Sequence, residues 1–316
     1  MIEIRNLVKN YGRVTALDDV SFDVNKGSIL GFLGPNGAGK STAMNIITGY
    51  MAPTSGDITV NGIDAVEKSL EARKMIGYLP ELPPLYGEMT VTEYLNFICD
   101  LKGVPQRKRK NMLSDIMFIV NIVDVRNRLV RNLSKGYRQR VGFAQALVGE
   151  PPILILDEPT VGLDPGQVIE FRKIITTLGR EKTIILSTHI LQEVTAVCSD
   201  VVIINHGKVA RAGALSEFTA SVPGEKRYVL TFDTSDKGAA ENILRSSSWI
   251  KSYSFSRTER NSLIYRISAD SRSEGIRELF FAAAQAGIAL LEIKAVEKSL
   301  EEEFVSIITK DAQEGA

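Results

Sequence analysis

One segment limits what this chain can fold into more than any other: Gly34-Pro35-Asn36-Gly37-Ala38-Gly39-Lys40-Ser41. It matches the phosphate-loop pattern, in which two glycines flank four residues and are followed by Lys-Ser. A short apolar run, residues 28–33, precedes it, and a helical pattern over residues 41–48 follows. The glycines let backbone N–H groups turn inward around an anion at a helix N-terminus, where the helix dipole favours negative charge. The sequence therefore predicts a nucleotide-phosphate site of the kind that kinases, GTPases and many ATPases share.

The composition is that of a globular chain long enough for two domains. Its 316 residues are 44% hydrophobic and carry a formal net charge of zero. Because the charge is balanced, no nucleic-acid partner is expected. Cys99 and Cys198 lie in apolar helical patterns without metal-like spacing, which predicts free, buried thiols of a reducing compartment. No segment approaches the roughly 18 continuous apolar residues of a membrane helix, so we expect any membrane link to run through a partner chain.

The order of hydrophobic patterns predicts the layers of the first domain. Alternation over residues 2–11 and 20–24 predicts antiparallel strands, and helical spacing over Thr90–Arg131 predicts a helical insertion. The apolar run Ile153–Leu156 predicts a central parallel strand buried on both faces. The pair Asp157-Glu158 follows directly, at the strand end where open α/β sheets bind ligands.

A second domain is predicted beyond a break near residues 221–224. Its patterns run strand, helix, strand, strand, helix, strand between residues 228 and 293, which is the order of a split βαβ, ferredoxin-like fold. A final amphipathic helix is predicted from Val296 to Ile308. Its acidic opposite face favours packing or dimerisation over membrane insertion.

A second motif decides the class of protein: Leu133-Ser134-Lys135-Gly136-Tyr137-Arg138-Gln139-Arg140. It lies just before a helix and ahead of the Asp157-Glu158 strand. With these motifs in this order and at this spacing, the chain resembles the ATP-binding cassette (ABC) family over residues 1 to about 215. The most similar branch is the ATP-binding subunits of ABC-2 type exporters, including gliding-motility and drug-export transporters, whose signature commonly has this Leu-Ser-Lys-Gly form.

The resemblance implies a fold and an activity. Residues 1–220 are expected to form an α/β P-loop NTPase cassette with a mixed core sheet, an antiparallel β subdomain and a helical subdomain at about 82–150. Residues 221–316 are expected to form a smaller C-terminal α+β, ferredoxin-like domain. The implied enzyme is an ATPase that converts ATP and water to ADP and phosphate, coupled to transmembrane transport. The implied cofactors are ATP and Mg²⁺.

The resemblance also implies which residues bind the nucleotide and its metal. Tyr11 would stack on adenine. Ser41, Asp157 and Glu81 would hold Mg²⁺, directly or through water. The phosphates would be bound by the loop and the residue after it: Gly34, Asn36, Gly37, Gly39, Lys40, Ser41 and Thr42.

Three residues are the implied catalytic groups. Lys40 would reach the β- and γ-phosphates, Glu158 would polarise the attacking water, and His189 would touch the γ-phosphate. Phosphoryl transfer needs in-line positioning and charge neutralisation more than covalent help from the protein, and this set supplies both.

A second copy of the cassette is the first implied partner. Ser134 and Gly136 would contact the γ-phosphate of the ATP held by the other protomer, and Asp164 would lie in the loop exchanged across that interface. Two cassettes would therefore meet head to tail with two ATP between them. One chain alone would contain half of each site.

Two positions depart from the family's commonest pattern. Glu81 stands where most members have glutamine, and its carboxylate adds negative charge beside the phosphates, which would tie its action to metal occupancy. The exporter branch often has this Pro-Glu pair, so we interpret it as a variant that keeps activity. Lys135 and Tyr137 replace a glycine and a glutamine, while Ser134 and Gly136 remain.

Integral membrane permease subunits are the second implied partner. Leu82–Tyr94 is an apolar, proline-rich segment suited to receive a helix of another protein, and the resemblance puts the coupling helix of a permease there. Ordinary packing between subdomains is the alternative.

The sequence therefore predicts a cytoplasmic ATPase subunit, peripheral on the inner face of the cell membrane, that dimerises around two Mg-ATP and drives separate membrane-spanning subunits of an exporter. Three alternatives stay open at this point. Soluble cassettes that act on ribosomes or nucleic acid usually fuse two cassettes or insert a long coiled coil, and neither occurs here. A regulatory cassette would bind nucleotide without turnover. A phosphotransferase would leave the signature segment unexplained.

Overall fold

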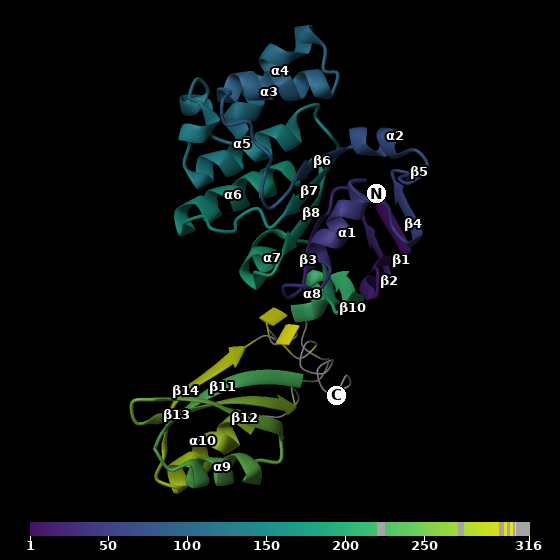
Figure 1. Cartoon of the computed structure of the whole chain (residues 1–316). Coiled ribbons are helices and arrows are strands. Elements are labelled where there is room, and N and C mark those ends of the chain that lie inside the picture. The colour runs from purple at the N-terminus through teal and green to yellow at the C-terminus, as the bar shows by residue number, and fades with distance from the viewer. Residues whose placement is uncertain (220–224, 271–274, 297–299, 302–303, 306, 308–316) are drawn as a thin grey trace. The chain divides into compact units, whose positions relative to one another are not determined.

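The structure, a computed structural model, describes residues 1–219, 225–270, 275–296, 300–301, 304–305 and 307 (Figure 1). It divides into two compact units, Met1–Leu215 and Ser216–Ser306. Each unit has a hydrophobic core of its own.

A six-stranded mixed sheet forms the centre of the first unit, in the order β10-β9-β3-β8-β7-β6. All neighbouring strands pair in parallel except β10, which pairs antiparallel with β9. Every residue of β3, β7 and β8 is buried, as expected for central strands covered on both faces, and their apolar residues follow one another instead of alternating with exposed ones. The predicted mixed core sheet is confirmed. Its strands are β3 (Ile29–Leu33), β6 (Ile76–Leu79), β7 (Ile153–Asp157), β8 (Thr183–Thr188), β9 (Asp200–Asn205) and β10 (Lys208–Ala214).

A four-stranded antiparallel sheet, in the order β2-β1-β4-β5, forms a second layer of this unit. Ile2, Ile4 and Ile58 alternate with exposed or half-buried residues and join the same core as Phe32 of the central sheet. The predicted antiparallel β subdomain is thereby confirmed. Its strands are β1 (Ile2–Tyr11), β2 (Val14–Val24), β4 (Ser55–Val60) and β5 (Ile63–Asp64).

The helices of the first unit fall into two groups. α3, α4 and α5 pack together as a helical region beside the sheet, whereas α1, α6 and α7 each follow a strand of the central sheet (Figure 1). α3 begins with a capping box, because Thr90 and Glu93 each accept a hydrogen bond from the other's backbone N–H. The bounds are α1 (Lys40–Ile47), α2 (Ser69–Lys74), α3 (Val91–Leu101), α4 (Gln106–Ile119), η1 (Val123–Val125), η2 (Val130–Asn132), α5 (Lys135–Leu147), α6 (Pro165–Leu178) and α7 (Leu191–Val197). The short helix α8 (Leu215–Thr219) begins at the last residue of this unit.

The second unit is an antiparallel sheet in the order β12-β13-β11-β14, with α9 and α10 packed against it. Inward side chains such as Leu230, Phe232 and Tyr265 meet Leu244 of α9 and Leu279 of α10 in one core. This is the predicted ferredoxin-like order of elements. The bounds are β11 (Glu225–Asp233), α9 (Lys237–Ser246), β12 (Ile250–Glu259), β13 (Ser262–Asp270), α10 (Gly275–Gln285) and β14 (Ala289–Val296).

The prediction of the final helix was wrong at its first residue. Val296 is the last residue of β14, where it pairs with Arg227 of β11. Strand pairing overrides the local helical spacing at this position. Most of the remainder of that predicted helix, residues 297–299, 302–303, 306 and 308, lies outside the described residues.

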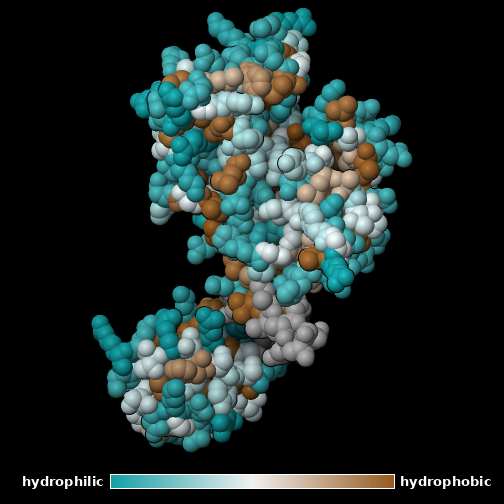
Figure 2. Space-filling model, in the orientation of Figure 1, coloured by the Kyte–Doolittle hydropathy of each residue, from teal (hydrophilic) through white to brown (hydrophobic). Residues whose placement is uncertain are grey.

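The surface and the helix lengths bear on how this chain meets other molecules. Figure 2 shows hydrophilic residues over most of the visible face, with hydrophobic ones in small groups between them. Among the residues that the structure describes, no helix combines the length and the apolar character needed to cross a bilayer.

Candidate functional site

The backbone of the loop between β3 and α1 requires glycine at three positions: Gly34, Gly37 and Gly39. Gly37 and Gly39 have φ values of 81° and 104°, in the region that favours glycine. A Cβ atom on Gly39 would lie 2.6 Å from a backbone oxygen, and one on Gly34 would lie 2.5 Å from another. α1 then begins at Lys40 with no side-chain cap from any described residue, so the N–H groups of its first turn are available to an anion.

Lys40 is held inside this loop. It is only 6% exposed, and its Nζ donates to the carbonyl oxygens of Gly34 at 2.8 Å and Pro35 at 3.2 Å. The same Nζ lies 3.4 Å from Oε1 of Glu158, so a buried cation and a buried carboxylate face each other at the phosphate loop.

Asp157 ends strand β7 inside the protein. Its Oδ1 is buried and has no hydrogen-bond partner among the described residues, which suits a bound water or cation. Burial raises the pKa of this carboxyl, while the nearby hydroxyls of Ser187 and Ser41 act in the opposite direction. The described residues contain no group of three or more His, Cys, Asp or Glu placed to hold a metal, and Mg²⁺ at nucleotide sites needs only one or two carboxylates beside phosphates and waters. The orphaned oxygen and the Ser41 hydroxyl therefore fit Mg²⁺.

Glu158 turns sharply away from the end of β7. Its φ is 46°, an uncommon left-handed value for a glutamate, and its backbone N–H donates to Ser187 O on the neighbouring strand at 2.9 Å. The turn brings its carboxylate to His189, whose Nδ1 is 2.9 Å from Oε2. His189 follows directly after β8 and is exposed on its other side.

One cavity of about 400 Å³ gathers most of the predicted phosphate and catalytic residues. It is lined by Asn36, Gly37, Gly39, Lys40, Ser41, Glu81, Glu158, Val161 and His189. Gly34 does not line the cavity, but its carbonyl oxygen accepts a hydrogen bond from Lys40, which does. A helix N-terminus and a lysine can neutralise phosphate charge here, and a carboxylate and an imidazole can orient a water, which is the equipment for phosphoryl transfer.

The two predicted signature residues do not line this cavity in the same chain. Ser134 is the N-cap of α5, where its Oγ accepts the Tyr137 N–H at 3.4 Å. Gly136 follows in the first turn, and a Cβ there would lie 2.3 Å from Oε1 of Gln167 on α6. Asp164 caps α6 by accepting the N–H of Gln167 at 3.0 Å. The signature and the Asp164 loop are therefore neighbours of each other.

Tyr11 and Thr42 also lie outside the cavity lining. Tyr11 is the last residue of β1 and is 47% exposed, with its hydroxyl donating to Sδ of Met51 at 3.0 Å. The Nζ of Lys9 lies 5.4 Å from the centre of its ring. The ring is therefore accessible and already next to a cation. Thr42 follows Ser41 in the first turn of α1.

Sequence reasoning missed Glu193 at this site. Glu193 lies in α7 and is 1% exposed, and its carboxylate accepts hydrogen bonds from Thr188 and Thr160. A glutamate four residues after His189 in a short helix carries no motif that predicts burial. The only available signal was its position directly after the strand that delivers His189.

Comparison with known proteins identifies the family. Residues 17–161 match the family model described as ABC transporter. The chain is 33% identical over 310 residues to the bacitracin transport ATP-binding protein BcrA of Bacillus licheniformis, covering 98% of this chain and 97% of BcrA. It is 29% identical over 310 residues to the linearmycin resistance ATP-binding protein LnrL of Bacillus subtilis (strain 168), covering 97% and 98% of the two chains.

Solved structures agree with this result. The first unit resembles the dimeric structure of MJ0796, a bacterial ABC transporter cassette, with a TM-score of 0.63 and 26% identity over 68% of this chain and 99% of that one. The same cassette has been solved as a post-hydrolysis dimer bound to ADP and Pi. The predicted fold class is confirmed, with a C-terminal β-sheet unit added to the cassette. The chain belongs to the ABC transporter family as an ATP-binding subunit, and that family is one of ATPases.

Proposed function

We propose that this chain is the ATPase subunit of an exporter, and that two copies close head to tail around two Mg-ATP to drive separate membrane-spanning subunits. One observation carries the proposal: the cavity that holds Lys40 and Glu158 does not include Ser134 or Gly136. A site that needs the signature residues is incomplete in one chain. A second protomer supplies them, which is consistent with the dimeric cassette that this chain resembles.

The roles within one half-site follow from the geometry. Lys40 and the N–H groups at the start of α1 bind the β- and γ-phosphates, with Asn36, Gly37 and Gly39 shaping the loop. Glu158 orients the attacking water, and His189 contacts the γ-phosphate from the same side as that carboxylate. Thr42 adds a phosphate contact in the first turn of α1.

Mg²⁺ binding rests on Ser41, Asp157 and Glu81. When bound, the ion would supply positive charge that neutralises the charge developing on the phosphates. Ser41 and Glu81, which line the cavity, and Asp157, whose buried Oδ1 has no partner among the described residues, would hold the ion. Glu81 is exposed, so its carboxylate is free to approach the metal and is repelled by phosphate when the metal is absent.

The base and the exchanged loop complete the nucleotide site. Tyr11 stacks its exposed ring on adenine. Asp164, at the start of α6, crosses to the other protomer with its loop. These assignments place the base at the antiparallel sheet and the γ-phosphate between the two protomers.

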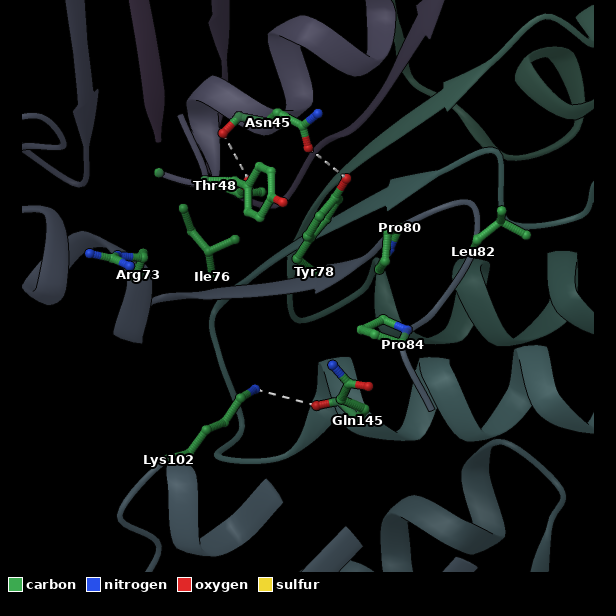
Figure 3. A pocket seen from close by; sticks show the side chains of 12 residues that line it. Asn45, Thr48, Arg73, Ile76, Tyr78, Pro80, Leu82, Pro84, Lys102 and Gln145 are labelled. Carbon is green, nitrogen blue, oxygen red and sulfur yellow. Dashed lines mark hydrogen bonds between the residues drawn. The ribbon is translucent and has the colours of Figure 1, made fainter. Parts of the chain in front are cut away.

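A permease docks in a second cavity, of about 480 Å³, shown in Figure 3. Asn45 of α1 and Thr48, directly after that helix, lie on one side (Figure 3). Pro80, Leu82 and Pro84 of the loop after β6 lie on another, and Lys102 and Gln145 approach from the helical region. Figure 3 also shows Tyr78 directed at Asn45, to whose Oδ1 its hydroxyl donates.

The chemistry of this groove defines the permease segment. Leu82 is 79% exposed at its edge, which offers an apolar contact to an amphipathic helix. Arg73 and Lys102 add positive charge, so the helix carries an acidic residue toward them. The end of the predicted Leu82–Tyr94 segment is closed to a partner, because Tyr94 is buried in the helical region and donates to Pro84 O, whereas Leu82 and Tyr86 are exposed.

Export is the direction best supported by the relatives. BcrA is named for bacitracin transport and LnrL for linearmycin resistance, and both match this chain over almost its whole length, including the second unit. Such a subunit works in the cytoplasm and is held at the inner face of the membrane by its permease.

The test combines turnover with capture of partners. The full chain with Mg-ATP should release phosphate, and Lys40→Ala should abolish that release, because the buried cation of the phosphate loop is lost. Affinity capture from membranes of the source cell should recover a chain with several long apolar segments. Nucleotide binding without phosphate release would contradict the ATPase role and favour a regulatory cassette. Recovery of RNA or DNA in place of membrane proteins would contradict the transport assignment.

A further inference from the structure

A buried carboxylate lies behind the catalytic pair and takes no part in the roles assigned above. Glu193 sits in the first turn of α7, and 1% of its surface is exposed. Among the described residues no Lys, Arg or His forms an ion pair with it. An isolated buried carboxylate costs free energy, and an apolar side chain of similar volume would be tolerated as well or better. Stability alone therefore does not account for a glutamate here.

Two threonine hydroxyls satisfy this carboxylate, one on each oxygen. Thr188 Oγ1 donates to Glu193 Oε2 at 2.8 Å, and Thr160 Oγ1 donates to Oε1. Both threonines are buried. Thr188 Oγ1 also accepts the backbone N–H of Ile190 at 3.0 Å, so its own proton is directed at Glu193. The carboxylate is thus an acceptor shared between two segments that are far apart in sequence.

Those two segments carry the catalytic pair. Thr160 lies two residues after Glu158, and Thr188 is the residue before His189. Glu158 has a left-handed backbone, a conformation that is unfavourable for a residue with a Cβ and persists only where the surroundings impose it. Glu193 supplies one such constraint, because it ties the segment after Glu158 to the end of the neighbouring strand.

We propose that Glu193 is a positioning residue for ATP hydrolysis, which holds the Glu158 and His189 segments at a fixed separation by accepting a hydrogen bond from each. The inference rests on the roles proposed for Glu158 and His189. Displacing a catalytic group by about 1 Å costs on the order of 10²-fold in rate. Nucleotide binding depends on the loop 34–41, which Glu193 does not touch. Losing Glu193 should therefore lower kcat and leave the KM for ATP unchanged.

The central variant is Glu193→Gln in the full chain. A glutamine has one oxygen to accept with, and its amide can only donate, so one of the two threonines loses its acceptor. We expect kcat to fall by about 10- to 100-fold with KM for Mg-ATP within about twofold, measured by phosphate release over a range of ATP concentrations. Thr195→Ala is the matched control, because Thr195 is exposed on the same helix.

Substitutions of Thr160 and Thr188 test whether their hydrogen bonds to Glu193, and not only the volume of their side chains, support hydrolysis. Thr160→Val and Thr188→Val keep the volume but remove the donors, and should each lower kcat as Glu193→Gln does. Thr160→Ser and Thr188→Ser keep the hydroxyls, and should restore kcat to within about threefold of the parent. The valine and serine variants carry the test if Glu193→Gln fails to fold, as judged by its thermal unfolding.

The outcomes are distinct. A parent-like kcat in Glu193→Gln and in both valine variants overturns the proposal. A fall in kcat that is accompanied by a rise in KM of similar size also overturns it. A parent chain with no Mg-dependent ATPase activity overturns the proposed function instead. A selective loss of kcat with recovery by serine establishes the positioning role.

Discussion

The Nδ1 atom of His189 lies 2.9 Å from Oε2 of Glu158 and 3.0 Å from Oε1. An ionised carboxylate only accepts hydrogen bonds, so the proton between these side chains is on Nδ1. The other ring nitrogen can then donate to a phosphate oxygen only when the imidazole is doubly protonated. Glu158, proposed to orient water, and His189, proposed to contact phosphate, are therefore linked through one proton.

Glu158→Gln is expected to bind ATP and to accumulate as a closed dimer with little hydrolysis. The amide keeps the size of the side chain and an oxygen for His189, but it loses the negative charge that polarises water, which typically costs ~10²- to 10³-fold in rate. Phosphate release measures the loss, and size-exclusion chromatography with Mg-ATP measures the dimer. Glu181→Gln, at an exposed position before β8, is the control. Hydrolysis at the parent rate would show that the water-orienting role is wrong.

Two substitutions at Ser134 should separate stability from dimer closure. Ser134→Ala removes the N-cap of α5, which costs about 0.5–2 kcal/mol, together with the hydroxyl proposed to meet the partner's ATP. Ser134→Asn keeps a capping oxygen, so it should unfold close to the parent temperature, yet it should still fail to dimerise with Mg-ATP. Thermal unfolding and light scattering make the comparison. An ATP-dependent dimer of Ser134→Asn as tight as that of the parent would contradict the proposed contact.

Tyr11→Ala is expected to weaken ATP binding. Stacking of a base on an aromatic ring contributes about 1–3 kcal/mol, which corresponds to roughly 5- to 150-fold in Kd. Tyr11→Phe keeps the ring and should bind like the parent, although it loses the hydrogen bond to Met51. Phe118→Ala, at an exposed aromatic of α4, is the control, and calorimetric titration with ATP is the measurement. Equal affinities for Tyr11→Ala and the parent would remove Tyr11 from the base site.

Lys102 should make the free energy of unfolding depend on alkaline pH. Its stem is exposed, but its amine turns inward and donates to Val148 O at 2.7 Å, and burial lowers the pKa of that amine from 10.5 to about 8. Between pH 8 and 10.5 the unfolded chain binds more protons at this position than the folded chain, so the contribution of Lys102 to the free energy of unfolding rises with pH.

Urea unfolding at pH 7.5 and 9.5 tests this dependence. The difference in unfolding free energy between the two pH values should be smaller in Lys102→Met than in the parent. Lys110→Met, at an exposed position of α4, should keep the parent's difference. An unchanged difference in Lys102→Met would mean that the amine titrates in the same way in both states.

The sequence was sufficient where one local pattern determines the outcome. Ile153–Leu156 is apolar at every position, so a buried parallel strand was the only good solution, and Asp157-Glu158 had to emerge at its end. The glycines of the phosphate loop were similarly informative, since Gly37 and Gly39 adopt backbone conformations that other residues rarely take.

The sequence was insufficient where a distant segment of the chain determines the conformation or the burial of a residue. Val296 fits a helical spacing with Leu300, but its pairing with Arg227 makes it a strand residue. Glu193 is a charged residue of the kind usually found at exposed helix positions, yet it is 1% exposed and accepts a hydrogen bond from Thr160, 33 residues earlier in the chain. The pairing of Val296 and this contact of Glu193 are long-range, so no window of local sequence contains them.

Helix α5 joins the surface proposed to meet the second protomer to the groove proposed to receive the permease. Ser134 caps its first turn, and Gln145, near its end, lines the groove of Figure 3 and accepts a hydrogen bond from Lys102 through its backbone oxygen. Its 13 residues at about 1.5 Å each span roughly 20 Å, and an intact helix hardly shortens under load. If the partner's ATP moves Ser134 as proposed, α5 would shift as a rigid body, and Gln145 in the groove would move with it.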